Sequence, residues 1–361
     1  MKQEKIKIIF VLPNLQAGGA ERVVSFVAQK LNPEIFDTTL VIIGYKKNAV
    51  YDLDSTNIVF FNKPRVQSGV VDLFKYIKRH KPQIVFSAVG HLNNVTAQFT
   101  WLFPKIKFVA REVNVLSVLA QFSKRSSRFN IKSKIAKGRF NRFDKVICQS
   151  QDMLDDLLKT YSIKPNKLVI INNPVTSSFK LKTDTKVSDP IQFITVARLV
   201  KQKGHARLIE VLGKLDFPFK YTIVGDGPEK NNILKRAKAL DFIDSIENIP
   251  FTKNVSKYLE KSDLYLQGSF VEGFPNAIIE SCMVGTPILA FNAPGGINEI
   301  IKPGINGYVV ENEKQYIDHL KKIKSSYNFT PSKVSETVSS RYSESIIIKK
   351  YENLFISILK K

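Results

Sequence analysis

The chain alternates between short apolar runs and segments in which apolar residues recur at helical spacing. The apolar runs predict strands at 6–12, 38–43, 58–61, 84–89, 107–110, 145–149 and 168–171. A helix is predicted over 20–31, and helical patterns fall between most of the other strands. Near-continuous Val, Ile and Phe runs separated by helices predict a parallel β-sheet that is covered by helices on both faces.

The same alternation begins again after a polar stretch. Residues 172–190 include Asn172-Asn173-Pro174 and a polar run from Thr183 to Asp189. Further strands are predicted at 191–197, 221–224, 264–266 and 287–291. A length of 361 residues also suits two domains of roughly 100–200 residues each. We therefore expect two Rossmann-like α/β domains, at 1–175 and 190–340, joined by a linker within 172–190.

The C-terminal segment, residues 345–361, has apolar residues at helical spacing. They are Ile346, Ile347, Tyr351, Leu354, Phe355, Ile358 and Leu359. This pattern predicts an amphipathic helix, which must bury its apolar face. The pattern alone leaves the docking site open. With the two-domain arrangement that the resemblance described below implies, we expect the helix to dock back on the first domain.

Composition places the chain among globular proteins, with 43% hydrophobic and 24% charged residues. Two cysteines, Cys148 and Cys282, cannot form a disulfide framework, and no uncharged apolar run approaches the roughly 18 residues of a membrane span. These features predict a cytoplasmic protein. The net charge is +23, and residues 1–184 alone have 30 basic and 13 acidic residues. This local excess predicts a polyanionic partner, either nucleic acid or an anionic bilayer.

A glycine pair follows the first predicted strand. Gly18 and Gly19 stand just before the helix at 20–31, where they would let the backbone approach a bound anion or sugar hydroxyl; a simple tight turn would need the same residues. The G-x-G-x-x-G spacing of dinucleotide sites and the G-x-x-x-x-G-K-[ST] pattern of nucleotide triphosphatases are both absent from this turn. Dehydrogenases and P-loop enzymes are therefore disfavoured.

Charged residues follow the strands of the second domain. Arg198 and Lys203 come after the strand at 191–197, at the carboxyl end of a parallel strand where open sheets bind ligands. Two fixed cations there could neutralise a diphosphate without a metal ion, whereas cations of this kind taken singly are most often solvated loop residues. The next strand leads into Gly225-Asp226-Gly227, a loop that could lie close to a nucleotide.

Two carboxylates follow the strand at 264–266. Glu272 falls in a loop, and Glu280 falls inside the helix that Pro275 is expected to begin. Carboxylates in these positions could accept hydrogen bonds from two different polyol groups. As an isolated pair they would be explained by surface charge and helix capping, and their coincidence with Arg198 and Lys203 favours the binding interpretation.

The order of these motifs resembles that of the retaining glycosyltransferases of the GT-B fold, group 1 (family 4). The motifs are Gly18-Gly19-Ala20-Glu21-Arg22, Arg198 with Lys203-Gly204, Gly225-Asp226-Gly227-Pro228, Glu272 to Glu280, Gly285-Thr286-Pro287, Ala293-Pro294-Gly295-Gly296 with Glu299, and Asn306-Gly307. The resemblance implies two Rossmann-like domains facing a cleft, with an acceptor-binding first domain and a second domain that binds a nucleotide-sugar donor.

The resemblance also implies residue roles. Arg198 and Lys203 would hold the donor diphosphate and stabilise the leaving group, while Glu272 and His91 would contact the donor sugar. Residues implied in donor binding are Gly18, Gly19, Gly225, Gly227, Gly273, Phe274, Pro275, Asn276, Ala277 and Glu280. Residues implied on the acceptor side are Arg111, Glu112 and Asn114.

No metal or other cofactor is implied, because the nucleotide sugar is itself a substrate and the two cations take the place of a metal. The D-x-D sequence Asp52-Leu53-Asp54, which suggests a metal site in other glycosyltransferases, is interpreted as part of a surface loop. Without the resemblance, a single histidine such as His91 after a strand would more often be structural.

The segment between Gln121 and Phe143 is rich in cations and has no acidic residue. Its cations are Lys124, Arg125, Arg128, Lys132, Lys134, Lys137, Arg139 and Arg142. Aromatic and aliphatic residues lie between them, a composition typical of an interfacial helix on an anionic membrane. Together with the resemblance, this predicts an enzyme on the cytoplasmic face of the inner membrane. We expect it to transfer a hexose or N-acetylhexosamine from a UDP-sugar to a polyprenyl-diphosphate-linked saccharide of a bacterial surface polysaccharide, such as capsule or O-antigen.

Two alternatives remain open at the level of sequence. A nucleic-acid-binding protein on a Rossmann-like scaffold would explain the charge but not the combination of Arg198, Lys203, Glu272 and Glu280. A sugar-nucleotide epimerase of the GT-B fold would use the nucleotide site but no acceptor. Salt-sensitive RNA binding would favour the first alternative, and donor turnover without acceptor would favour the second.

Overall fold

The structure is a computed structural model that describes residues 4–51, 57–122, 138–183 and 187–360. Lys124, Arg125, Arg128, Lys132, Lys134 and Lys137 of the predicted membrane segment, and Asp52 to Asp54, lie outside the described residues. The chain divides into two compact units. Unit 1 comprises Met1–Leu116, Lys124–Pro174 and Ser345–Lys361, and unit 2 comprises Ser117–Ser123 and Val175–Glu344.

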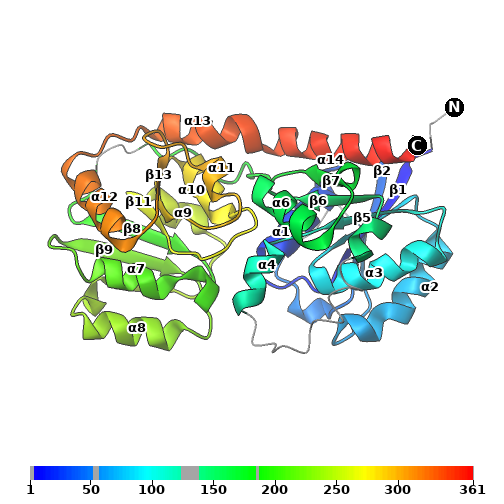
Figure 1. The fold of residues 1–361 in the computed structure, drawn as a ribbon, viewed down its shortest axis with the longest axis horizontal. Helices are drawn as coiled ribbons and strands as arrows, with labels where there is room; N and C mark the ends of the chain where they lie inside the picture. Colours follow the sequence, from blue (N-terminus) through cyan, green and yellow to red (C-terminus); the bar gives the residue numbers. More distant parts are fainter. Residues whose placement is uncertain (1–3, 52–56, 123–137, 184–186, 361) are drawn as a thin grey trace. The chain divides into compact units, whose positions relative to one another are not determined.

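Unit 1 is built on a parallel sheet whose strand order is β3-β2-β1-β4-β5-β6-β7 (Figure 1). Its strands are β1 (Ile6–Leu12), β2 (Phe36–Ile42), β3 (Asn57–Phe60), β4 (Ile84–Ala88), β5 (Lys107–Arg111), β6 (Lys145–Cys148) and β7 (Leu168–Ile170). Its helices include α1 (Gly19–Lys30), α2 (Val70–His80), α3 (Gly90–Leu102), α6 (Gln151–Tyr161) and α14 (Glu344–Leu359). A short helix, α4 (Leu116–Leu119), lies at the boundary between the units.

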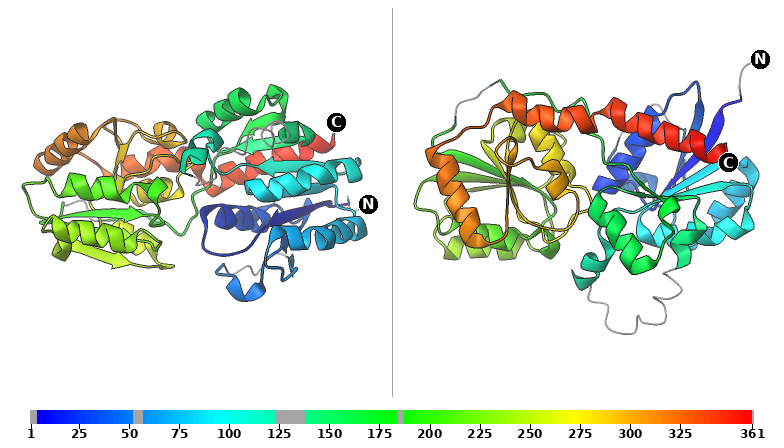
Figure 2. Two further views of the ribbon diagram at one scale, coloured as in Figure 1. Left: turned by 60° about the horizontal axis from the view of Figure 1, so that its bottom comes forward. Right: turned by 45° about the horizontal axis from the view of Figure 1, so that its top comes forward.

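The C-terminal helix α14 contributes to the core of unit 1. Its buried residues Ile347, Tyr351 and Phe355 belong to the same hydrophobic cluster as residues of α1 and of the central strands. The Phe355 ring makes edge contacts with Phe10 and Phe86, at centroid distances of 6.0 and 6.1 Å. The apolar side chains of this helix are therefore buried against one face of the sheet. The right-hand view of Figure 2 shows α14 running across that sheet.

Helices α2 and α3 cover the opposite face of this sheet. A right-handed crossover places a helix on the face set by the direction in which the chain moves along the sheet. The chain moves one way from β1 to β2 and the other way from β3 to β4 and β5. Phe74 of α2 contacts Phe99 of α3 at a centroid distance of 6.1 Å, so the two helices pack against each other.

Unit 2 is built on a second parallel sheet, with strand order β10-β9-β8-β11-β12-β13. Its strands are β8 (Ile191–Val196), β9 (Phe219–Val224), β10 (Ile246–Ile249), β11 (Leu264–Gln267), β12 (Ile288–Phe291) and β13 (Gly307–Val310). Its helices include α7 (His205–Leu212), α8 (Lys230–Ala239), α9 (Val255–Glu260), α10 (Asn276–Val284), α11 (Ile297–Ile300), α12 (Glu313–Ser325) and α13 (Pro331–Tyr342). The predicted pair of Rossmann-like parallel-sheet domains is confirmed.

Two strands of unit 2, β10 and β13, were not predicted from the hydrophobic pattern. Both lie at the edges of the sheet and have four residues each. In β10 only partly buried and exposed side chains occur, so the sequence Ile-Glu-Asn-Ile lacks the continuous apolar run of a central strand. Edge strands of this kind are defined mainly by their pairing with a neighbouring strand, and this pairing cannot be read from the local sequence.

Both sheets have a topological switch point. In unit 1 the chain leaves β1 in one direction and returns to β4 on its other side. In unit 2, β8 is flanked in the same way by β9 and β11. Parallel sheets bind ligands at the carboxyl edge where the strand order reverses. This position is occupied in unit 1 by the residues that follow β1 and β4, and in unit 2 by those that follow β8 and β11.

Candidate active site

An ion pair connects the two loops at the switch point of unit 2. Lys203 follows β8, and its Nζ lies 2.6 and 2.7 Å from Oε1 and Oε2 of Glu272, which follows β11. Ser269 Oγ and Gln267 Nε2 also donate to Glu272 Oε1, at 2.6 and 2.9 Å. Glu272 is only 6% exposed. A carboxylate held by several donors is fixed in orientation, which suits a residue that receives a polar ligand.

Arg198 lies in the same loop but on the surface, since its side chain is exposed. Its backbone carbonyl is 3.2 Å from Nε2 of the buried His205. Burial lowers the pKa of His205 to about 4, so the ring is neutral at pH 7. The His205 side chain therefore supports the loop that carries Arg198 without adding charge to it.

Two glycines let the loop after β9 lie directly on the loop after β8. A Cβ atom at Gly225 would lie 1.9 Å from the carbonyl oxygen of Ala197, and one at Gly227 would lie 2.5 Å from that of Leu199. The backbone N–H of Leu199 donates to the carbonyl of Asp226 at 2.9 Å. The structure therefore gives Gly225 and Gly227 a packing role, and direct contact with a nucleotide stays a prediction.

The loop after β11 is packed in the same manner on both of its sides. Gly204, at φ +62°, lies so close to Gly268 that a Cβ would be 1.7 Å from the Gly268 carbonyl oxygen. On the other side, a Cβ at Gly295 would be 2.2 Å from the carbonyl oxygen of Glu272. The glycine-rich motifs of the second domain thus bring the loops after β8, β9, β11 and β12 into contact. This layer fixes the backbone on which Arg198, Lys203 and Glu272 stand.

The loop after β11 ends in helix α10. Asn276 is its first residue, and Pro275 precedes it as the N-cap, one position earlier than a proline in the first turn. Glu280 lies inside α10 and is 5% exposed, as the sequence predicts for its place in the helix. Phe274 is also buried, with its ring 5.0 Å from that of Tyr342, so its side chain belongs to the core of unit 2 and its predicted donor contact stays a prediction. Gly273 is buried and Ala277 is partly buried.

At the switch point of unit 1, Gly18 precedes α1 as its N-cap and Gly19 is the first residue of the helix. His91 lies in the first turn of α3, after β4. It is exposed, and partial desolvation lowers its pKa below the usual value. The preceding Val89 has φ +79°, which is strained for a β-branched residue and is typical of functional turns.

Arg111 and Glu112 lie inside unit 1, with 1% and 0% exposure. Arg111 Nη2 donates to Asn173 Oδ1 at 2.5 Å, and Glu112 Oε1 accepts from Asn93 Nδ2 at 2.8 Å. Burial raises the pKa of Glu112, partly offset by its hydrogen bond to Asn93. Glu112 lies against the turn that carries His91, since a Cβ at Gly90 would be 3.9 Å from its Oε2, whereas the Arg111 side chain interacts with Asn173 and with Tyr351 of α14. The acceptor-side role of both residues stays a prediction. Asn114 is partly buried, and its Oδ1 accepts from the N–H of Val115.

Two cations of the predicted membrane segment, Arg139 and Arg142, are among the described residues, and both pack on aromatic rings. The Arg139 guanidinium lies 4.6 Å from the centroid of Phe140, and the Arg142 guanidinium lies 3.9 Å from that of Trp101. Arg142 Nη1 also donates to Gln98 Oε1 at 2.8 Å.

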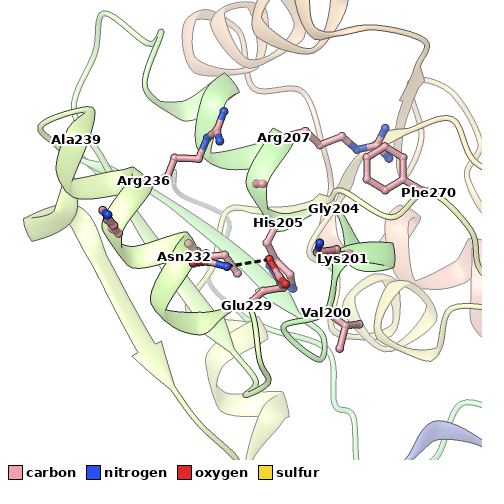
Figure 3. Close-up of a pocket in the computed structure, with 13 residues that line it drawn as sticks. Val200, Lys201, Gly204, His205, Arg207, Glu229, Asn232, Arg236, Ala239 and Phe270 are labelled. Carbon is pink, nitrogen blue, oxygen red and sulfur yellow. Dashed lines mark hydrogen bonds between the residues drawn. The ribbon is translucent and has the colours of Figure 1, made fainter. Parts of the chain in front are cut away.

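A cavity of about 630 Å³ lies between α7 and α8 in unit 2 (Figure 3). Lys201, His205, Arg207, Asn232 and Phe270 are among its lining residues. Arg198, Lys203, Glu272 and Glu280 do not line it, so this cavity is distinct from the predicted donor site.

Among the described residues, no group of three or more His, Cys, Asp and Glu side chains is arranged to hold a metal ion. No described helix is both long and apolar enough to cross a membrane.

Residues 178–336 match the family described as glycosyl transferases group 1, and residues 17–179 match glycosyltransferase family 4. An uncharacterized glycosyltransferase of Haemophilus influenzae is 30% identical over 313 residues, which cover 84% of this chain and 86% of that protein. A Campylobacter jejuni protein is 26% identical over 331 residues, covering 87% and 89% of the two chains. It is named N-acetylgalactosamine-N,N'-diacetylbacillosaminyl-diphospho-undecaprenol 4-alpha-N-acetylgalactosaminyltransferase.

Among solved structures, Anabaena HepE in complex with UDP-glucose is similar to this chain, with a TM-score of 0.82 and 17% identity. The similarity covers 98% of this chain and all of that one. At this level of identity it supports the fold alone.

Sequence reasoning missed the partners of Glu272. Lys203 and Glu272 were expected to bind different parts of the donor, and no contact between them was predicted. Gln267 and Ser269 were not singled out, although both donate to Glu272. Their positions at the end of a strand, within five residues of a candidate carboxylate, are the signal that could have identified them.

Proposed function

Because this chain belongs to the group 1 glycosyltransferases, enzymes of the GT-B fold, we propose that unit 2 binds a UDP-sugar and that the enzyme transfers its hexose or N-acetylhexosamine with retention of configuration. The observation that supports the donor site is the arrangement of charged side chains in the loops that follow β8 and β11. There the exposed Arg198 lies in one loop with Lys203, which is paired to the buried Glu272.

The chemistry follows from these charges. A nucleoside diphosphate gains negative charge as it leaves, and Arg198 with Lys203 would stabilise that charge where a metal ion does so in other enzymes. A ligand phosphate would compete with Glu272 for Lys203. Glu272 would then accept hydrogen bonds from sugar hydroxyls, and Glu280 from the ribose. No carboxylate is assigned as a covalent nucleophile, so catalysis would rest on positioning and charge stabilisation, with the donor phosphate assisting removal of the acceptor proton.

The donor and acceptor are proposed from the relatives. HepE is a structural neighbour solved with UDP-glucose, which supports a UDP-sugar. The Campylobacter relative carries a diphospho-undecaprenol saccharide in its name, which supports a polyprenyl-diphosphate-linked acceptor. Relatives named for amylovoran and O-antigen biosynthesis support a role in a bacterial surface polysaccharide. We place the enzyme on the cytoplasmic face of the membrane, where such acceptors would be extended.

The proposal is tested by titrating the protein with UDP, GDP, UDP-glucose, UDP-N-acetylglucosamine and UDP-N-acetylgalactosamine by calorimetry, in EDTA and again in Mg²⁺. One UDP-sugar should bind equally well in both buffers. Arg198→Ala should weaken its binding by about 10- to 100-fold, the effect of losing a charge-assisted contact of roughly 1.5–3 kcal/mol. Lys257→Ala removes an exposed cation from α9 and serves as the matched control.

Transfer is tested with that donor and a polyprenyl-diphosphate saccharide, and NMR of the product gives the anomeric configuration. An inverted product would refute retention, and binding that requires Mg²⁺ would refute the metal-free donor site. Donor turnover without any acceptor would identify an epimerase instead.

A further inference from the structure

The C-terminal ends of α2 and α3 lie together in unit 1. Both helices connect strands of one parallel sheet on one face, so they run in the same direction, and Figure 1 shows them side by side. Phe103, which follows α3, lies 5.2 Å from Phe74 of α2, measured between ring centroids. Lys78 is one turn beyond Phe74 and therefore projects on the same side of α2.

Two consecutive apolar residues at the end of α3 are exposed. Trp101 is 69% exposed and Leu102 is 58% exposed. Trp101 is the one tryptophan in the sequence. Both side chains are directed away from the core, and an adjacent Trp-Leu pair in contact with water is typical of an interaction surface.

The exposed charges at the C-terminal ends of α2 and α3, and the arginine that contacts Trp101, are positive. The sequence from 73 to 111 contains no Asp or Glu. Lys78 and Lys105 are exposed, and Arg142 stacks on Trp101. The acidic residues that flank this part of the unit are paired, since Asp72 binds Lys63 at 3.2 Å and Asp144 binds Lys107 at 3.4 Å. We call Lys78, Trp101, Leu102, Lys105 and Arg142 the tryptophan patch.

We propose that the tryptophan patch docks unit 1 on an anionic lipid bilayer. Trp101 and Leu102 would enter the boundary between headgroups and acyl chains, where tryptophan is enriched in membrane proteins. Lys78, Lys105 and Arg142 would lie at the level of the phosphates, with their aliphatic stems along the apolar pair.

The geometry favours a bilayer over a nucleic acid. The Arg142 guanidinium covers one face of the indole ring at 3.9 Å, so only the other face could stack on a base, and no second aromatic ring stands beside Trp101 in this patch to continue a stack. Leu102, beside it, offers no stacking surface. A lipid interface, in contrast, accepts both side chains through burial of apolar area and requires no stacking geometry.

This inference rests on the proposed function, because a lipid-linked acceptor is what would bring the enzyme to a bilayer. Trp101 and Leu102 end α3, whereas His91 lies in its first turn, so the tryptophan patch and the turn that carries His91 lie at opposite ends of this helix. Docking through the patch would hold that turn about 15 Å from it along the helix axis, at 1.5 Å per residue.

The test uses the intrinsic fluorescence of Trp101 in the full-length protein. Vesicles of phosphatidylglycerol and phosphatidylcholine should shift the emission to shorter wavelength, and vesicles of phosphatidylcholine alone should not. Brominated lipids should quench the emission, and raising the salt concentration should weaken binding because exposed charges are screened.

Variants test whether vesicle binding depends on the tryptophan patch. Sedimentation with vesicles measures the binding of each variant. Trp101→Ala with Leu102→Ala, and separately Lys78→Glu with Lys105→Glu, should each reduce partitioning roughly tenfold, the loss expected when apolar or electrostatic anchoring is removed. Ile305→Ala is the matched control, since Ile305 is a 49% exposed apolar residue in unit 2 and should leave partitioning unchanged.

Sedimentation with vesicles but without any change in Trp101 emission would overturn the proposal, as would a shift caused by single-stranded RNA and not by vesicles. Calorimetric donor binding on the same samples separates the two hypotheses. A protein that binds a UDP-sugar but ignores anionic vesicles refutes the docking surface alone. A protein that docks through Trp101 but binds no nucleotide sugar refutes the proposed function alone.

Discussion

At the scale of single residues, the second unit uses glycine to bring backbone against backbone. At Gly225, φ is +153° and the space of a Cβ is filled by the carbonyl of Ala197. The side chains with candidate chemistry, Lys203 and Glu272, stand on loops held by such contacts. Substituting such a glycine would therefore displace Lys203 and Glu272, even though the glycine itself contacts no ligand.

We predict that Gly225→Ala lowers the free energy of unfolding of unit 2 by more than about 2 kcal/mol, because the backbone of one loop must move. Donor affinity should fall in parallel. Gly138→Ala is the control, since among the described residues no atom outside the local chain lies within 4 Å of the added Cβ. Chemical denaturation measures both variants, and equal stabilities would contradict the packing argument.

A second prediction concerns the buried His205. Burial lowers its folded-state pKa to about 4, below the ordinary value of 6.5. The unfolded state therefore binds more protons between these values, and the contribution of His205 to stability is lost as the pH falls from about 6.5 to about 4. At about 1.4 kcal/mol per pKa unit, this amounts to ~3 kcal/mol.

His205→Gln removes the titrating group and keeps a polar side chain. The variant should lose less stability than the wild type between pH 7 and pH 4, as measured by urea unfolding across that range. Parallel curves for the two proteins would show that folding does not lower the pKa of His205.

At the scale of elements, α14 shows how a C-terminal helix becomes part of a core. Its hydrophobic stripe identifies the helix, and the structure buries that stripe against α1 and the central strands of unit 1. A hydrogen bond from the N–H of Asn32 to Glu352 Oε1, at 2.9 Å, adds a polar contact between α14 and the loop after α1.

Phe355→Ala should destabilise unit 1 by about 3–5 kcal/mol, the usual cost of deleting a buried aromatic ring. Phe355 is 0% exposed and contacts Phe10, Phe36 and Phe86. Ile346→Ala on the same helix is the control, because Ile346 is 36% exposed. Thermal unfolding compares them, and similar melting temperatures would mean that α14 is not part of the folded core.

At the scale of the whole molecule, the two units have separate hydrophobic cores and are built from different numbers of chain segments. Almost all of unit 2 is continuous, from Val175 to Glu344, whereas unit 1 needs Ser345–Lys361 to complete it. The first 174 residues therefore depend on a segment that follows the whole of Val175–Glu344 in the sequence.

We predict that a fragment of residues 175–344 folds with a cooperative unfolding transition. A fragment of residues 1–174 should not do so until a peptide of residues 345–361 is added, because its sheet would expose the face that α14 covers. Circular dichroism during thermal unfolding measures both fragments. A cooperative transition of residues 1–174 alone would contradict this division of the core.

Sequence alone determined the fold class, since apolar runs and helical spacing are local properties that each element carries. It also placed Arg198, Lys203, Glu272 and Glu280 after particular strands, and parallel topology then brings strand ends to one edge. The short edge strands β10 and β13 were not predicted from the sequence, because their pairing with a neighbouring strand, and not their composition, defines them.

Only the tertiary structure decided which side chains meet. It paired Lys203 with Glu272, buried Arg111 and Glu112 inside unit 1, and exposed Trp101 with Leu102. Such contacts join residues far apart in the chain, and a Trp-Leu pair at the end of a helix has the same sequence whether it is covered or open. The physical reason is that burial and contact depend on the packing of the whole unit, which no local pattern encodes.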